Sequence, residues 1–223
     1  MSDPNSGLPA ASPVTPETPA QPLVQRTVLL RNATTAPVQF YIYVSGDTPE
    51  HPVWLAQKVP ADASVTLRWT EEWSYFWSQK GVRGEIQTEA SQRYPTRGST
   101  LCNLVTLQFV EGMPQFTDPR ITPEAGTLTI QQDGSVWPGA ALVGFALSGL
   151  PVVAQPTRPN ESVIFELPSP ITYYVGFQPL DQPNPAREGE PVPPGGQEWL
   201  LFASPDITYA EATLTGTQIV VSH

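Results

Sequence analysis

Short apolar or alternating runs, separated by turn residues, fill the chain from residue 23 onward. Alternation of apolar and polar side chains is the period of a strand with one face on a core. The runs are rich in β-branched and aromatic residues, and turn signals recur roughly every 8–12 residues. We therefore predict roughly thirteen strands in an all-β fold with two packed antiparallel sheets, a β-sandwich. The main runs are 24–31, 38–44, 52–58, 64–69, 73–79, 84–90, 103–109, 126–132, 162–168, 171–177, 197–203 and 207–222.

Residues 1–22 have a different composition, with six prolines and only two charged residues. Such a segment cannot bury enough apolar surface to offset its ordering entropy. We predict a disordered Pro-rich tail over 1–22, followed by a single all-β domain over 23–223. The first residues show no basic and apolar signal-peptide pattern, and Cys102 is the only cysteine. We expect a cytoplasmic protein, with unconventional export left open.

The stretch from Gly134 to Thr157 contains no charged residue and is nearly long enough to span a bilayer. Prolines and glycines interrupt it, and Ser148-Gly149 is typical of a tight turn between two short strands. We predict a buried β-hairpin and no stable membrane span. The alternative is a toxin-like protein that inserts this hairpin into lipid as part of a closed barrel.

Proline, at 27 residues, argues against long helices, so only 90–102 is expected to hold a helical turn. The segment 178–196 is predicted to be a long Pro/Gly loop. The formal net charge of −10 disfavours nucleic acid as a partner. One local group of basic residues is interleaved with acids, and we interpret it as a solvated loop. That group consists of Lys80, Arg83, Arg93 and Arg97.

Catalytic chemistry has little support in the residue inventory. His51 lies in a Pro-flanked turn and His223 is the last residue, so neither is placed for a catalytic triad. One cysteine and two distant histidines do not make an ordinary zinc site, so we predict no metal and no cofactor. We interpret Cys102 as a small, semi-buried apolar residue. Paired carboxylates of a glycoside hydrolase are the remaining enzymatic hypothesis. The candidates are Glu71, Glu72, Glu85, Glu89 and Glu166.

Trp73, Tyr75 and Trp77 project to one face of the predicted strand 73–79. If these rings were exposed, they would form a platform for stacking sugars or bases. If they were buried, they would fill the core between two sheets. The exposed platform is our candidate binding site, and the core is the competing interpretation.

The neighbouring residues favour the core interpretation. The preceding run, 64–69, has an apolar face against which the rings can pack. Ser74 and Ser78 lie on the opposite face of the aromatic strand, and we expect them to face water. We therefore predict that at least two of the three aromatic residues belong to the core.

A set of motifs resembles a known family. It consists of Trp54-Leu55-Ala56, Trp69, Tyr75-Phe76-Trp77-Ser78-Gln79, Glu89-Ala90-Ser91-Gln92, Pro95, Asn103, Val105-Thr106-Leu107, Gly126-Thr127-Leu128, Ile130, Asp133-Gly134, Val143-Gly144 and Ser148-Gly149. The set is similar to RhiA, the rhizosphere-expressed protein, and its bacterial relatives. The resemblance covers roughly residues 25–155 and does not include the tail or the 178–196 loop.

The resemblance implies a cytosolic protein of bacteria that live around plant roots, produced under cell-density-dependent (quorum) regulation. It carries over no activity, cofactor or catalytic residue. Our leading hypothesis is a non-enzymatic β-sandwich binding or interaction protein with a protein or carbohydrate partner. Homo-oligomerisation is left open. The membrane-inserting hairpin of 134–157 and the carboxylate-dependent glycoside hydrolase are the alternatives.

Overall fold

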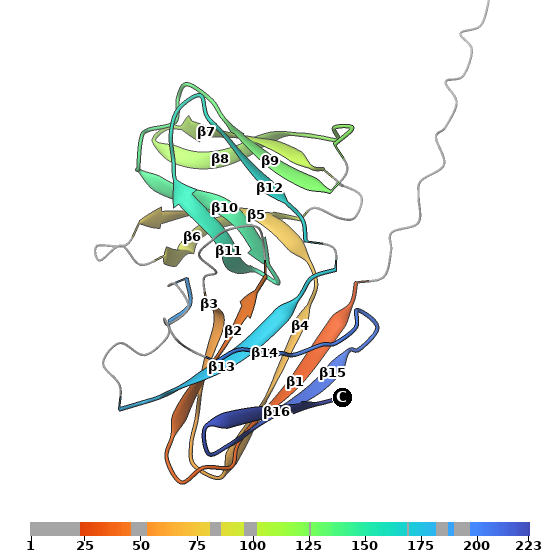
Figure 1. Ribbon diagram of the computed structural model, residues 1–223. Coiled ribbons are helices and arrows are strands. Elements are labelled where there is room, and N and C mark those ends of the chain that lie inside the picture. The colour runs from red at the N-terminus through yellow and green to blue at the C-terminus, as the bar shows by residue number, and fades with distance from the viewer. Residues whose placement is uncertain are drawn as a thin grey trace, which may run out of the picture.

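The computed structural model describes residues 23–45, 53–80, 86–95, 102–124, 126–168, 170–181, 187–189 and 197–223, with side chains at all of these except 79–80 and 86–95. Within these ranges the chain forms sixteen strands and no helix, which confirms the predicted all-β fold (Figure 1). The strands form four sheets of four instead of the two predicted sheets. The predicted tail, residues 1–22, lies outside the described residues.

Two of the sheets form a first sandwich. The Trp69 ring of sheet I packs against Trp54 and Tyr173 of sheet II, with centroids 5.3 and 5.2 Å away. Sheet I has the order β16 (Gln218–Ser222), β15 (Tyr209–Thr215), β1 (Gln25–Asn32) and β4 (Ala63–Thr70). Sheet II has the order β14 (Trp199–Leu200), β13 (Tyr173–Pro179), β2 (Val38–Val44) and β3 (Val53–Val59).

The other two sheets form a second sandwich in the same way. Phe145 and Trp73 of sheet III each lie 5.2 Å from the Phe165 ring of sheet IV. Sheet III has the order β11 (Leu150–Pro156), β10 (Ala141–Leu147), β5 (Trp73–Lys80) and β6 (Ile86–Pro95). Sheet IV has the order β12 (Ser162–Glu166), β9 (Thr127–Gln132), β7 (Leu104–Val110) and β8 (Met113–Arg120).

The two sandwiches are stacked, with sheet III facing the first sandwich (Figure 1). Trp54 Nε1 of β3 donates a 3.2 Å hydrogen bond to the Leu147 carbonyl of β10. Only Glu71 and Glu72 separate β4 from β5, so the chain passes directly from sheet I into sheet III. One continuous cluster of buried apolar side chains includes residues from all four sheets.

Two strand pairs are parallel, which corrects the expectation of purely antiparallel sheets. β1 pairs in parallel with β15, and β7 with β9. A parallel pair requires a long crossover connection. For β1 and β15 the crossover is the whole intervening chain, which adds β4 to sheet I and builds the other three sheets before it reaches β15.

The prediction of a helical turn within 90–102 is wrong for the first six of these residues. Positions 90–95 belong to β6, which pairs antiparallel with β5. This pairing supplies the backbone hydrogen bonds that a helical turn would otherwise have to make.

The uncharged stretch does form the predicted hairpin, and the hairpin belongs to the core. Ser148 and Gly149 have φ of 50° and 78°, as a two-residue hairpin turn requires. β10 is a central strand between β5 and β11, and its residues are almost all buried. Gly144 is packed so closely that an added Cβ would lie 1.8 Å from the Val153 carbonyl oxygen. Insertion into lipid would therefore require this hairpin to separate from β5 and to leave the core.

The side chains of Trp73, Tyr75 and Trp77 are core residues, with exposed fractions of 5%, 0% and 6%. Sheet IV covers them, so they present no exposed platform and the core interpretation agrees with the structure. The expectation that Ser74 and Ser78 face water is wrong, because both are buried. The second face of β5 is covered because sheet III lies between sheet IV and the first sandwich (Figure 1).

We predict that Trp73→Ala and Trp77→Ala each lower the free energy of unfolding by about 3–5 kcal/mol, because a large buried ring leaves a cavity. Urea melts of the purified variants measure this. Trp137→Ala is the matched control, because its side chain is 58% exposed, and it should cost about 1 kcal/mol or less. Near-wild-type melts for both buried variants would contradict the core assignment.

Candidate functional site

Arg26, on β1, is a buried cation, with an exposed fraction of 3%. Its Nε donates a 2.8 Å hydrogen bond to the Glu71 carboxylate, and its Nη1 donates to the Ile207 carbonyl. The guanidinium carbon lies 5.0 Å from the centroid of the Phe202 ring, a cation–π contact. Arg26 therefore connects β1 both to the residues just after β4 and to the residues just before β15.

Glu71 is held from two further directions. The Tyr173 hydroxyl of β13 donates a 3.0 Å hydrogen bond to the same carboxylate oxygen, Oε1. Burial and the neighbouring Glu71 carboxylate raise the pKa of Tyr173, which keeps the phenol protonated and available as a donor. The backbone N–H of Glu71 donates a 2.8 Å hydrogen bond to the Val24 carbonyl. The first residues of β1 are thus fixed through both side chain and backbone.

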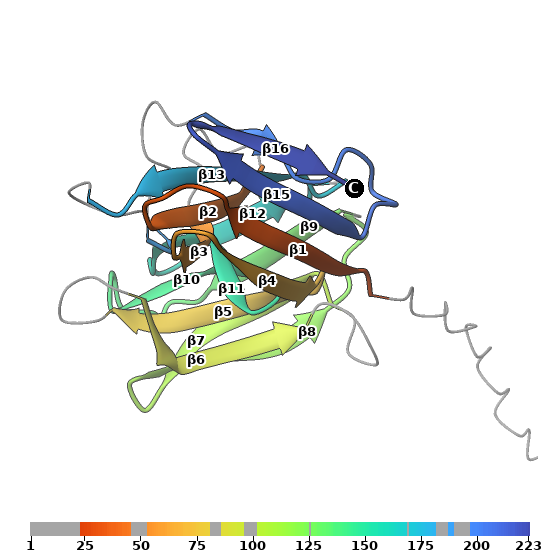
Figure 2. The same ribbon diagram turned by 90° about the horizontal axis from the view of Figure 1, so that it is seen from below.

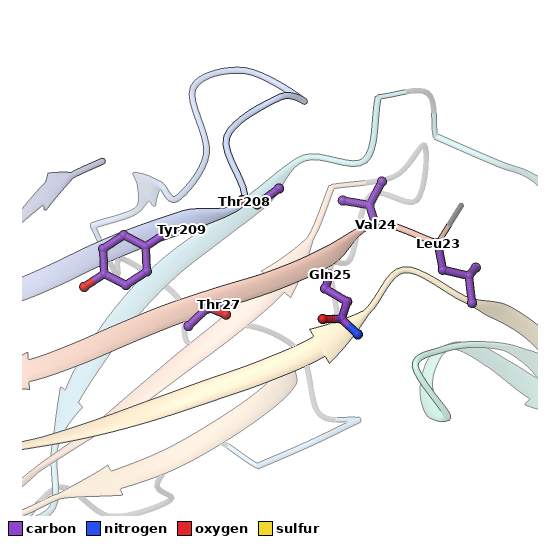
Figure 3. A pocket seen from close by; sticks show the side chains of 6 residues that line it. All are labelled: Leu23, Val24, Gln25, Thr27, Thr208 and Tyr209. Atoms are coloured by element: carbon purple, nitrogen blue, oxygen red, sulfur yellow. The ribbon is translucent and has the colours of Figure 1, made fainter. Parts of the chain in front are cut away.

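An open groove of about 580 Å³ lies where β1 and β15 begin (Figure 3). Gln25 and Thr27 flank Arg26 and project to the opposite, solvent-facing side of β1. Thr208 and Tyr209 follow Ile207, whose carbonyl Arg26 binds, and the Thr27 N–H donates a 2.9 Å hydrogen bond to the Thr208 carbonyl. The ion pair therefore supports the strands that line the groove. The lining residues are Leu23, Val24, Gln25, Thr27, Thr208 and Tyr209.

Tyr209 supplies the exposed aromatic surface that the aromatic row of β5 does not. Its side chain is 45% exposed. On sheet I it pairs in register with Thr27, which in turn pairs with Arg68 of β4. Figure 2 shows the strands β15, β1 and β4 side by side in this order. An exposed ring beside amide and hydroxyl groups can stack on a ligand and hydrogen-bond to its rim. This arrangement is suited to binding.

The carboxylates of the hydrolase hypothesis have varied surroundings. Glu71 is occupied by Arg26 and Tyr173, and Glu72 is half-buried between β4 and β5. Glu166 is exposed at the end of β12. Glu85 lies outside the described residues, and Glu89 lies on β6, whose side chains are not described.

Cys102 is buried, at 3% exposure, and Tyr75 donates a 3.3 Å hydrogen bond to its backbone carbonyl. Burial raises the pKa of the thiol, which keeps it in the unreactive protonated form. His223 is exposed, whereas His51 lies outside the described residues. Of the basic group, Arg83 and Arg97 also lie outside them, and the side chains of Lys80 and Arg93 are not described.

Metal-ligating clusters and membrane-spanning helices are the two remaining kinds of site. No group of three or more His, Cys, Asp or Glu side chains in the described residues is placed to hold a metal ion. No helix long and apolar enough to cross a bilayer is found in the same part of the chain.

Arg26 and Tyr209 are absent from the sequence-based predictions, although the strand pattern carries a signal for both. Arg26 lies two and four residues before the buried Val28 and Leu30, so the alternation along β1 places its charge on the core face. Tyr209 lies an odd number of residues from the buried Ala210 and Ala212, so the alternation along β15 places its ring on the solvent face.

The fold and the groove together define an all-β protein with a ligand-sized surface on one sheet. The sequence model of the RhiA family matches residues 24–183. Because this match covers more than half of the chain, the protein belongs to the RhiA family, and the match extends further than the 25–155 that the motifs suggested. No curated protein and no solved structure matches the chain.

Removing one partner of the buried ion pair should be costly. We predict that Arg26→Met lowers the free energy of unfolding by about 3–5 kcal/mol, because it leaves the largely buried Glu71 carboxylate without its cation. Arg120→Met is the matched control, because Arg120 pairs with Asp118 at the exposed surface, and it should change stability by about 1 kcal/mol or less. Chemical denaturation of both variants tests this, and equal costs would show that Arg26 acts only as a surface residue does.

We predict that thiol reagents label Cys102 slowly in the native protein and rapidly in denaturant. Burial shields the sulfur and raises its pKa, so only molecules that open locally or globally expose a thiolate. The release of chromophore by a disulfide reagent at neutral pH measures the rate. Labelling of native protein as fast as of unfolded protein would contradict the buried position.

Proposed function

We propose that this RhiA-family protein is a non-enzymatic binding protein, and that it holds its partner in the groove beside Tyr209. The observation that carries the proposal is the exposed Tyr209 ring next to Gln25 and Thr27, above strands anchored by the buried Arg26–Glu71 pair. Rigid support under a binding surface reduces the ordering cost of association.

The chemistry of the groove supports binding rather than catalysis. Its polar side chains are an amide, two threonine hydroxyls and a phenol, which donate and accept hydrogen bonds. General acid–base catalysis uses groups whose pKa lies near the operating pH, usually histidine or carboxylates. The nearest such group on β1's inner side, Glu71, is occupied by Arg26 and Tyr173.

The partner is a carbohydrate or a protein. The strands that line the groove, β1 and β15, are both interior strands of sheet I. Most of their backbone is already paired on both edges, because β1 pairs with β4 and β15, and β15 pairs with β16 from Glu211 onward, so recognition uses side chains instead of strand addition. We further propose a cytoplasmic protein of root-associated bacteria, the setting that the resemblance to rhizosphere-expressed proteins implies.

Arrays of oligosaccharides and peptides, probed with the labelled full-length chain, test the proposed site. We expect retention on one class of probe, and a loss of about tenfold or more in Tyr209→Ala, because the ring no longer stacks. Thr66→Ala is the control, because Thr66 is exposed on the same sheet and does not line the groove. Equal signals from wild-type protein and Tyr209→Ala would contradict the groove as the binding site.

A further inference from the structure

A single row of side chains crosses sheet I at the groove. Tyr209, Thr27 and Arg68 are in register on β15, β1 and β4, so their side chains leave the same face of the sheet. Two strand spacings separate Tyr209 from Arg68, so the Cα atoms of these two residues lie about 10 Å apart. The row offers an aromatic ring at one end, a hydroxyl in the middle and a positive charge at the other end.

The positive charge on this face is available to a ligand. Arg68 and Arg31 are both exposed there, and within the described residues neither has a carboxylate at ion-pair distance. Two exposed arginines elsewhere are ion-paired. The carboxylate of this face, Glu211, accepts a 3.0 Å hydrogen bond from Thr213 and lies in the neighbouring row, two strands from Arg68. A protein with a net charge of −10 thus presents an unpaired cation beside its groove.

We infer that the groove binds an acidic sugar, a uronic-acid residue of an oligosaccharide, and that Arg68 binds the sugar carboxylate. The inference rests on the proposed function and names its ligand class. The apolar C–H face of the sugar ring stacks on Tyr209. The Gln25 amide and the Thr27 hydroxyl bind the ring hydroxyls, since each can both donate and accept. The guanidinium matches a carboxylate with two parallel hydrogen bonds.

An acidic peptide is the competing occupant, because it also carries carboxylates. The arrangement favours a sugar for two reasons. Most of β1 and β15 is paired on both edges, since β1 pairs with β4 throughout and with β15 from Thr27, and β15 pairs with β16 from Glu211, so little backbone is left on which a peptide could add as a strand. The surface between the ring and the cation is polar and presents the Thr27 hydroxyl rather than an apolar pocket for a peptide side chain.

Titration calorimetry with the full chain and three probes tests the inference. The probes are a β-1,4-linked mannuronate hexamer, its neutral counterpart mannohexaose, and a hexaglutamate peptide. We expect the mannuronate hexamer to bind best and its affinity to fall as salt rises, because the exposed ion pair is screened. Arg68→Gln should weaken mannuronate binding about 10- to 100-fold, the value of a charge-assisted hydrogen bond, and should leave mannohexaose unaffected.

Lys58→Gln is the control, because Lys58 is an exposed cation on β3 of sheet II, and it should leave all affinities unchanged. Equal binding of mannuronate hexamer and mannohexaose, both lost in Tyr209→Ala, would overturn the acidic ligand and leave the proposed groove intact. Hexaglutamate binding as tightly as mannuronate would overturn the sugar in favour of an acidic peptide. If a probe binds and neither Tyr209→Ala nor Arg68→Gln alters its affinity, both the inference and the proposed groove are wrong. If no probe binds, the inference is overturned.

Discussion

The buried ion pair between Arg26 and Glu71 is the interaction on which the first sandwich and its groove depend. Removing two charges from water is expensive, and the attraction between them offsets that cost only where further hydrogen bonds satisfy both groups. Here the Tyr173 hydroxyl serves the carboxylate, while the Ile207 carbonyl and the Phe202 ring serve the guanidinium. Strands β1, β4, β13 and β15 therefore meet around one pair of charges, and their relative positions are fixed by polar geometry as well as by apolar packing.

The position of Glu71 extends this constraint toward the second sandwich. Glu71 and Glu72 form the whole link between β4 and β5, and the Glu72 carbonyl accepts a 2.8 Å hydrogen bond from Ser148 in the β10–β11 turn. The aromatic strand β5 starts immediately afterwards with Trp73, which packs on Phe165. A two-residue link leaves the two sandwiches little freedom to move apart, so the charge pair and the aromatic core lie within one packed unit.

Alternation and turn residues predicted most strands, because the side-chain period of two is a local property of the sequence. They did not predict how strands are distributed among sheets, because that depends on long-range packing. β8 was missed because Pro114 and Pro119 break its pattern, although β8 is an edge strand of sheet IV, where proline is tolerated. The run 207–222 is continuous in its pattern, whereas Gly216, with φ of 62°, turns the chain between β15 and β16.

The candidate site was harder to predict than the fold, since aromatic density does not distinguish a core from a binding surface. The dense row on β5 is buried because sheet IV covers it, whereas an isolated tyrosine on β15 is exposed. The alternation of side chains along each strand indicated which of these residues are exposed. Tyr209 lies on the polar face of β15, and Arg26 lies on the apolar face of β1. The alternation could not predict that β1 pairs in parallel with β15. This pairing brings Thr27 and Tyr209 together from opposite ends of the chain.

The residues that support the groove lie within the family match, whereas one of the proposed ligand contacts lies outside it. Arg26, Glu71 and Tyr173 all lie within the matched residues, 24–183, as do Thr27 and Arg68. Tyr209 lies beyond them, on a strand that joins sheet I through parallel pairing to β1. The anchored strand and the cation therefore lie in the part of the chain that the family model matches, whereas the Tyr209 ring lies in the segment that follows. The inferred ligand would therefore contact both the residues that the family model matches and the strand β15 that follows them.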